Sequence, residues 1–506
     1  MRATSSAPSR TITALLTLAL AATSAVVAGA SLAPAAGAPA PRPSLALHAA
    51  KEESHVSRPR GEEVWAPLPV FVTPVGGAFD LRVRRADFFS PITVSQAVHE
   101  EDGSVTEYPL STLVTKEWQG LRDFARITIT NPKGVVTEGR TGTFCPNAWE
   151  AQRLSPDGAH TPTYPYWCGG GTLTLGSTWG IDDGWGVPVD ERGAVMLDGP
   201  VGTWTVTITI RPKYQNLFGI DPADASSTVS YHVENGPGDH CRGCKEADRR
   251  PADTASGSTN RSHARPDVRT LRAAPPSANL PDLQSLPSFD IEIDHRGGKD
   301  FVAFASTVWV GGESKLDIEG FRRPHEDVMD AYQYFYDGDD VVGKAGVGTL
   351  EFDTRRGHHH WHLQQFAQYR LLDADQEHVR ISKKQSFCLA PTDATNLAID
   401  GAAWRETGED LGSACGGDEA VWIREVLPLG WGDTYYQNRG GQDFNITGIP
   451  NGTYYVSVEA NPTRELFETD TTNNEALRKI ILKGQPGNRR ICVPAVGVIR
   501  AEGTCR

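Results

Sequence analysis

The chain has 506 residues, of which 39% are hydrophobic and 22% charged, and this composition supports packed cores and excludes a globally disordered protein. Its length exceeds that of an ordinary single domain, so we expect two or three domains. Lys and Arg total 49 against 63 Asp and Glu, a formal net charge of -14. This balance argues against a protein that binds nucleic acid or an anionic membrane, and it favours a cationic partner or substrate.

The N-terminus predicts export. Arg2 and Arg10 precede an uncharged stretch that ends in small residues at 28–30, which is typical of a secretory signal peptide over residues 1–30; an uncleaved anchor is the alternative. No later stretch reaches membrane-spanning length, so we expect a secreted, extracellular protein that is not held in a membrane after signal cleavage. The Ala-, Gly- and Arg-rich composition also favours a bacterial source.

Eight cysteines in an exported chain are expected to be oxidised and paired. Pairing of sequence neighbours would close four short loops, but many connectivities are open for the set Cys145, Cys168, Cys241, Cys244, Cys388, Cys415, Cys492 and Cys505. For Cys241 and Cys244, which are separated by two residues, a local disulfide is favoured over half of a zinc site or a redox pair.

The first organised block is predicted to be a β-sandwich-like domain of unknown role over residues 61–235, after a flexible leader at 31–60. Apolar residues alternate with Thr over 203–210, which indicates a strand with one buried face, and a second strand is expected over 228–233. Seven of the 12 Trp residues lie in this block, where core packing is the commoner role and a ligand platform the alternative.

A linker is predicted over residues 236–279, because this segment has no aromatic residue with which to build a core. The second block, 280–484, is also expected to be mainly β. Its strand-like stretches are 301–310, 364–372, 421–426 and 454–458, and its one short helix candidate is Pro324–Tyr336. A C-terminal tail over 485–506 carries Cys492 and Cys505, which are expected to clip it to the domain.

The strongest local signal is a run of histidines just before a strand-like stretch. On a strand, His358, His360 and His362 would share one face, while His359 and Trp361 point to the other. Three imidazoles on one face suit a nitrogen-preferring metal ion, copper or zinc, with copper the tighter binder. Three protein ligands with open positions indicate a catalytic metal centre, and the alternative is a solvated polar strand or an adventitious metal binder.

This histidine pattern and the segments that follow it resemble the lysyl oxidase family. The segments similar to that family, in chain order, are His358-x-His360-x-His362, Phe366-Ala-Gln-Tyr369, Lys384-Gln-Ser-Phe-Cys388-Leu389, Asp433-Thr434-Tyr435, Asn445-Ile-Thr447, Pro450-x-Gly452-x-Tyr454, Val458-x-x-Asn461-Pro462 and Asp470-x-x-Asn473-Asn474. Several motifs in the same order over a long stretch are far more specific than one histidine cluster.

The resemblance implies a mostly-β copper amine oxidase domain with His358, His360 and His362 as ligands of Cu²⁺. It implies that Lys384 and Tyr435 form the cofactor lysine tyrosylquinone; motif spacing selects them over Lys383 and Tyr436. The implied activity is a protein-lysine 6-oxidase, which uses molecular oxygen to convert peptidyl lysine of extracellular proteins, or a related primary amine, to the aldehyde with release of ammonia and hydrogen peroxide. The rival hypotheses are a non-catalytic copper-binding or adhesive surface protein and an oxidase of free small amines.

The resemblance also implies the disulfides Cys388–Cys415 and Cys492–Cys505. We expect Lys384 to lie in a partly desolvated pocket near the copper, which would lower the pKa of its amine. Asp433 and Asp470 are both candidates for the base that removes the substrate proton, and a capping or turn role is the alternative for each. The segment 353–357 lacks the aromatic and Cys residues that precede the histidines in animal members of the family.

Overall fold

Strands make up nearly all of the regular structure, so the predicted mainly β class is confirmed. A computed structural model describes residues 41–58, 60–61, 63–100, 102–110, 118–140, 142–147, 150–190, 192–236, 274–275, 277–323, 326–338, 340–354, 360–382, 384, 386–405, 415–418, 420–437, 441–497, 501–503 and 505. The predicted signal peptide, most of the predicted linker, and Cys241 and Cys244 lie outside these residues. No helix in the described part of the chain is long and apolar enough to cross a membrane.

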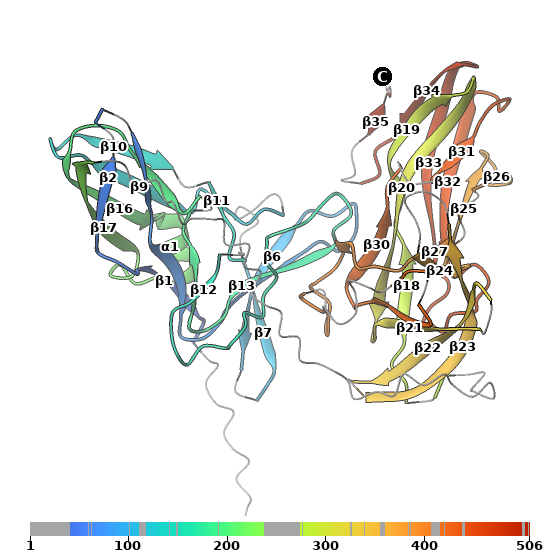
Figure 1. Cartoon of the computed structure of the whole chain (residues 1–506), viewed down its shortest axis with the longest axis horizontal. Coiled ribbons are helices and arrows are strands. Elements are labelled where there is room, and N and C mark those ends of the chain that lie inside the picture. Colours follow the sequence, from blue (N-terminus) through green and yellow to red (C-terminus); the bar gives the residue numbers. More distant parts are fainter. Residues whose placement is uncertain are drawn as a thin grey trace, which may run out of the picture. The chain divides into compact units, whose positions relative to one another are not determined.

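The first block contains three sheets of four or five strands and two strand pairs (Figure 1). The four-stranded sheets are β1-β4-β14-β12 and β13-β5-β6-β7, the five-stranded sheet is β10-β9-β16-β17-β2, and the pairs are β11-β8 and β15-β3. The element bounds are β1 Ser44–Ala49, β2 Glu53–Arg58, β3 Val64–Pro67, β4 Val70–Val75, β5 Phe79–Arg84, β6 Thr93–His99, β7 Val105–Pro109, β8 Leu121–Arg122, β9 Ala125–Thr130, β10 Val136–Arg140, β11 Thr143–Phe144, β12 Gln152–Arg153, β13 Gly176–Ile181, β14 Trp185–Pro188, β15 Ala194–Leu197, β16 Gly202–Ile210, helix α1 Pro212–Phe218 and β17 Ser226–Asn235.

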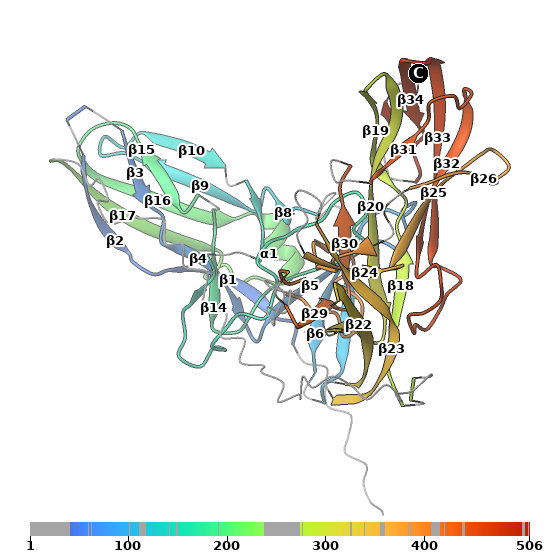
Figure 2. The same ribbon diagram turned by 45° about the vertical axis from the view of Figure 1, so that its right-hand side comes forward.

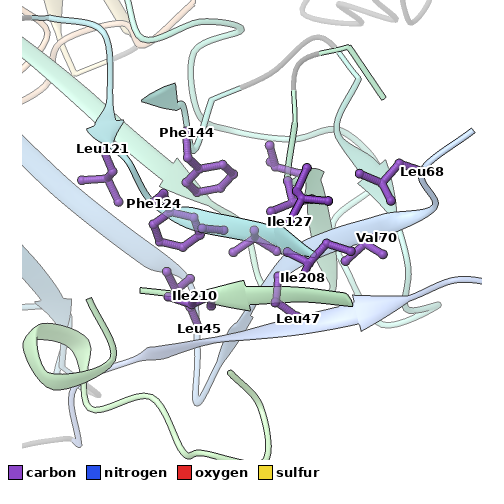
Figure 3. Packing of buried hydrophobic residues seen from close by; sticks show 14 of the residues in the cluster. Leu45, Leu47, Leu68, Val70, Leu121, Phe124, Ile127, Phe144, Ile208 and Ile210 are labelled. Carbon is purple, nitrogen blue, oxygen red and sulfur yellow. The ribbon is translucent and has the colours of Figure 1, made fainter. Parts of the chain in front are cut away.

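The alternating pattern in the first block forms the predicted strand. β16 buries Trp204, Val206 and Ile208 on one face, and the Thr residues between them point outward. Figure 3 shows Ile208 packed with Leu47, Val70 and other side chains of the same core cluster. The alternation of apolar and Thr residues therefore indicates a strand with one face in the core.

The leader prediction is wrong from residue 44 onward. β1 pairs with β4 in antiparallel fashion, and β2 pairs with β17 in parallel fashion. Leu45 and Leu47 of β1 are buried in the core of this block. The mixed composition of this segment hides its strands, because the strands and core residues that they pack against are distant in sequence.

The second block contains three six-stranded sheets (Figure 2). They follow the paths β18-β20-β30-β28 with β19 and β31 also on β20, β27-β24-β23-β22-β21-β29, and β26-β25-β32-β33-β34-β35. The strand bounds are β18 Pro281–Ser285, β19 Phe289–Arg296, β20 Lys299–Gly312, β21 Leu316–Arg322, β22 Val328–Asp337, β23 Asp340–Asp353, β24 His360–Gln364, β25 Ala367–Leu372, β26 His378–Ile381, β27 Ser386–Phe387, β28 Asp393–Ala394, β29 Trp422–Leu427, β30 Trp431–Tyr435, β31 Asp443–Asn445, β32 Gly452–Ala460, β33 Glu475–Gln485, β34 Asn488–Val493 and β35 Glu502–Gly503.

The helix predicted over 324–336 is absent from the described part of this segment, where β22 lies instead. β22 sits between β21 and β23, and its residues 331–336 are all buried. A strand buried on both faces shows no alternation of polar and apolar residues, so its sequence cannot be told from a short buried helix.

Three disulfides are present among the described cysteines. Cys145 is bonded to Cys168, Cys388 to Cys415 and Cys492 to Cys505, so both pairs implied by the resemblance are confirmed. The last of these joins β34 to the segment after β35, and β34 itself pairs with β33. The C-terminal tail is therefore tied to the sheet, as the sequence predicts.

Candidate functional site

Two of the three predicted copper ligands lie on β24. The rings of His360 and His362 face the same side of the strand, with centroids 4.8 Å apart. Trp361 is fully buried, and its indole N–H donates to the carbonyl of Gly417 at 2.9 Å. His358 lies outside the described residues.

The surroundings of His362 hold its ring in one orientation. Its Nδ1 lies 3.3 Å from Oδ2 of Asp353 on β23 and 3.4 Å from Oγ of Ser386 on β27. Histidines that bind metals usually have their other ring nitrogen held by a carboxylate or similar group, which fixes the ring for the metal. The ring of His362 is therefore oriented as that of a metal-binding histidine would be, with Asp353 as the supporting carboxylate.

No group of three or more His, Cys, Asp or Glu side chains in the described part of the chain is placed to hold a metal ion. The predicted triad depends on His358, which lies outside that part. The two described histidines thus fit the donor set that copper prefers without completing it.

Lys384 and Tyr435 lie in contact. The Lys384 Nζ is 4.3 Å from the centroid of the Tyr435 ring and 4.8 Å from that of Phe387. Only 1% of Lys384 is exposed, so the desolvated setting predicted for it is confirmed, and the pKa of its amine stays a prediction. Its backbone N–H donates to Oγ of Ser382 at 3.1 Å, and Gly441 packs against its Cβ.

Tyr435 ends β30 and is held at its hydroxyl and at its ring. The hydroxyl donates to the carbonyl of Cys388 at 2.7 Å. The ring meets that of Phe387 edge-on, with centroids 5.0 Å apart, and this contact joins β30 to β27. Burial raises the pKa of the Tyr435 phenol well above its usual range, and the carboxyls of Asp433 and Glu425 add to this shift.

The structure separates the two candidate bases. Asp433 lies on β30, is 4% exposed, and accepts a hydrogen bond from the backbone N–H of Ala390. Burial raises the pKa of Asp433 well above its usual range, although the nearby amine of Lys384 opposes this shift. Asp470 is exposed, and its Oδ1 accepts the hydroxyl of Thr472 at 2.7 Å and the backbone N–H of Thr472 at 2.8 Å. These hydrogen bonds hold a turn and lower the pKa of Asp470.

Two further buried polar residues surround Tyr435 and were not singled out from the sequence. Gln442 donates from Nε2 to the backbone carbonyl of Tyr435 at 3.1 Å and to Oγ of Ser306 at 3.1 Å. Glu425 on β29 is fully buried, and burial raises the pKa of its carboxyl well above the usual range. A Glu within the predicted strand 421–426 is the sequence signal that could have drawn attention to Glu425.

The Cys388–Cys415 disulfide connects the two halves of this site. Cys388 supplies the acceptor for the Tyr435 hydroxyl, while the carbonyl of Cys415 accepts the backbone N–H of Trp361 at 2.8 Å. The disulfide therefore links the histidine strand β24 to the segment that holds the tyrosine.

The lysyl oxidase family model matches residues 344–492 of this chain, a range that contains His360, His362, Lys384 and Tyr435. Three vertebrate proteins are similar to it over part of this region. Lysyl oxidase homolog 3B of Danio rerio is 29% identical over 135 residues, which is 27% of this chain and 15% of that protein. Lysyl oxidase homolog 4 of Mus musculus is 30% identical over 138 residues, and lysyl oxidase homolog 2 of Xenopus tropicalis is 29% identical over 137, each covering 25% of this chain and 16% of the relative.

Residues 344–492 are thus similar to the lysyl oxidase family, and the chain spans about one sixth of the length of the relatives it matches. The first block, residues 44–235, lies outside the matched range. These relatives give no support to the predicted bacterial source.

Proposed function

We propose that the protein is a secreted copper-dependent amine oxidase of the protein-lysine 6-oxidase kind. It would convert peptidyl lysine, or a related primary amine, with oxygen and water to the aldehyde, ammonia and hydrogen peroxide. The observation that carries this proposal is the contact between Lys384 and Tyr435, whose amine nitrogen and ring centroid lie 4.3 Å apart although the two residues are distant in sequence. A fully buried lysine against a partly buried phenol is unusual unless the two groups react or are paired.

Three histidines would hold the metal ion, and a lysine and a tyrosine would form the organic cofactor. His358, His360 and His362 would bind Cu²⁺, and copper with oxygen supplies the oxidation of the Tyr435 ring that lets the Lys384 amine join it as lysine tyrosylquinone. The neighbouring residues orient the Tyr435 ring and the Lys384 amine. The Cys388 carbonyl holds the Tyr435 hydroxyl, and Phe387 lies against both the ring and the amine.

Asp433 is the better candidate for the group that accepts the substrate proton. Its carboxyl is buried, and the charge of the Lys384 amine acts on it. Burial raises the pKa of Asp433 above its usual range, and a raised carboxyl pKa favours the acceptance of a proton. Asp470 instead serves a surface turn.

The test is a peptide map by mass spectrometry of the exported protein after aerobic incubation with copper. We expect the peptides that contain Lys384 and Tyr435 to be covalently joined. Tyr435→Phe and Lys384→Arg are expected to abolish the cross-link, whereas Tyr436→Phe and Lys383→Arg, at the neighbouring positions, are expected to retain it.

Unmodified peptides in a fully copper-loaded sample would overturn the proposal and leave the non-catalytic copper-binding or adhesive surface protein as the better account. If the cross-link forms, turnover of a lysine peptide is compared with turnover of a free diamine. Preference for the peptide supports an oxidase of protein lysines, and preference for the diamine an oxidase of small amines.

A further inference from the structure

Glu425 is hydrogen-bonded to the backbone of Leu389, the residue after Cys388, whose carbonyl holds Tyr435. Its Oε2 accepts the N–H of Leu389 at 3.1 Å, and both residues are fully buried. A carboxyl placed in a core costs free energy unless it is hydrogen-bonded, so this contact is the main compensation visible for Glu425.

The N–H of Leu389 and the carbonyl of Cys388 belong to one peptide unit. That carbonyl accepts the Tyr435 hydroxyl at 2.7 Å. A peptide unit is planar and rigid, and in its trans form the N–H and C=O point in opposite directions. Fixing the N–H of this unit therefore fixes the direction of its carbonyl, so Glu425 and Tyr435 hold the two ends of one planar group.

The same hydrogen bond joins two edges of a sheet. β27 and β29 are the edge strands of the six-stranded sheet β27-β24-β23-β22-β21-β29. Glu425 projects from β29 to the segment that directly follows β27. The Cys388–Cys415 disulfide anchors the side chain of Cys388, and the Glu425 contact holds the peptide unit that follows it.

We propose that Glu425 is a positioning residue for Tyr435, which acts through the Cys388–Leu389 peptide. It holds the carbonyl toward the Tyr435 hydroxyl and so keeps the ring beside the Lys384 amine. This role deepens the proposed function and rests on it for its effect on the cross-link. The position of Tyr435 itself does not depend on that function.

Three substitutions separate this role from simple core filling. Glu425→Gln keeps the size and offers an amide oxygen to the N–H of Leu389. Glu425→Met keeps most of the volume and removes the acceptor, and Glu425→Asp keeps the carboxyl but draws it back by one methylene. Glu319→Met is the control, because Glu319 is a fully buried acid on β21, the strand next to β29.

The first readout needs no copper and no cross-link. In copper-free full-length protein, nitration of tyrosines by tetranitromethane is followed at single residues by peptide mapping. Loss of one net hydrogen bond corresponds to a factor of about five to ten, so Tyr435 is expected to be nitrated about five- to tenfold faster in the Met and Asp variants. The Gln variant and Glu319→Met are expected to match the wild type. Tyr436, which is 45% exposed, serves as internal control.

The second readout is the rate of the Lys384–Tyr435 cross-link with copper, which is expected to fall in the Met and Asp variants and to stay near wild type in the Gln variant. Unchanged nitration of Tyr435 in both the Met and Asp variants would overturn the positioning role, as would a Gln variant as impaired as they are. Faster nitration in them, together with a wild type that forms no cross-link, would uphold the positioning role and refute the proposed oxidase.

Discussion

Under the proposed function, Asp433 is the residue whose charge state would bear most directly on turnover. Asn has the same shape but cannot accept a proton, so Asp433→Asn is expected to lower kcat for a lysine peptide by about 10² to 10⁴, the usual contribution of a general base. The Tyr435 hydroxyl bonds to Cys388 and not to Asp433, so the Lys384–Tyr435 cross-link is expected to persist. Oxygen consumption and the peptide map measure the two effects.

Asp470→Asn is the matched control, because Asp470 lies in an exposed turn. It is expected to keep wild-type kcat. A large loss of kcat in this variant, with little loss in Asp433→Asn, would transfer the role of base to Asp470.

Burial of Glu425 has a consequence for stability at different pH values. Its pKa is raised well above the ordinary 4.5, so the folded protein keeps a proton that the unfolded chain releases. Its stabilising effect is complete below the unfolded pKa and is lost as pH rises through the folded pKa. The free energy of unfolding is therefore expected to decline as pH rises above 4.5, and Glu425→Gln is expected to reduce that decline. Urea unfolding of the wild type and of Glu425→Gln at several pH values measures this decline. An equal decline of the free energy of unfolding in both proteins would contradict the prediction.

Sequence alone reaches some of these residues and not others. The resemblance to the lysyl oxidase family implies that Lys384 and Tyr435 are partners, and the fixed neighbours in each motif select these two residues over Lys383 and Tyr436. A Glu within a predicted strand marks Glu425 as unusual, but its role is not predictable from the sequence, because its partner is a backbone N–H. The choice between Asp433 and Asp470 also needed the structure, because burial separates two otherwise equivalent carboxylates.

At the scale of elements, the chain at Gly441 lies against Lys384 and limits where the Lys384 side chain can lie. Gly441 has a φ of 89°, and a Cβ placed there would lie 2.9 Å from the Cβ of Lys384. Gly441→Ala is therefore expected to displace Lys384 and to lower the yield of the Lys384–Tyr435 cross-link several-fold, as read from the peptide map.

The control is Gly448→Ala, because Gly448 has a φ of 80° and no atom within 4 Å of the added Cβ. Both variants carry the backbone strain of a positive φ, about 1 kcal/mol. Only Gly441→Ala adds the clash with Lys384. Equal losses of cross-link in the two variants would show that backbone strain, and not the position of Lys384, is responsible.

The strands that the sequence predicts correctly include β16, which has one solvated face, and also β20 and β29, which are buried on both faces. β16 alternates between Thr and apolar residues, and its prediction was confirmed. β22 is buried on both sides over most of its length, so it was mistaken for a helix. β1 and β2 were assigned to a leader because partners far away in sequence stabilise them.

For the whole molecule, composition and turn content were enough to predict a mainly β protein, and ordered motifs were enough to predict the type of its second block. The first block has no comparable motif, and its 17 strands bury an extensive core without indicating a ligand. Packing residues are chosen for shape and hydrophobicity, so they specify a fold and leave its function open.

The net charge of -14 predicts how substrates are selected. Charges on the protein attract a cationic substrate over roughly a Debye length, which is about 10 Å at 0.1 M salt and about 3 Å at 1 M. For a lysine peptide with further Lys and Arg residues, kcat/KM is expected to fall several-fold as salt rises across this range, while kcat stays constant. For a peptide of the same length with Asp and Glu around its lysine, kcat/KM is expected to rise or stay level. An equal decline for both peptides would mean that salt acts on the protein itself, and substrate selection by charge would then be refuted.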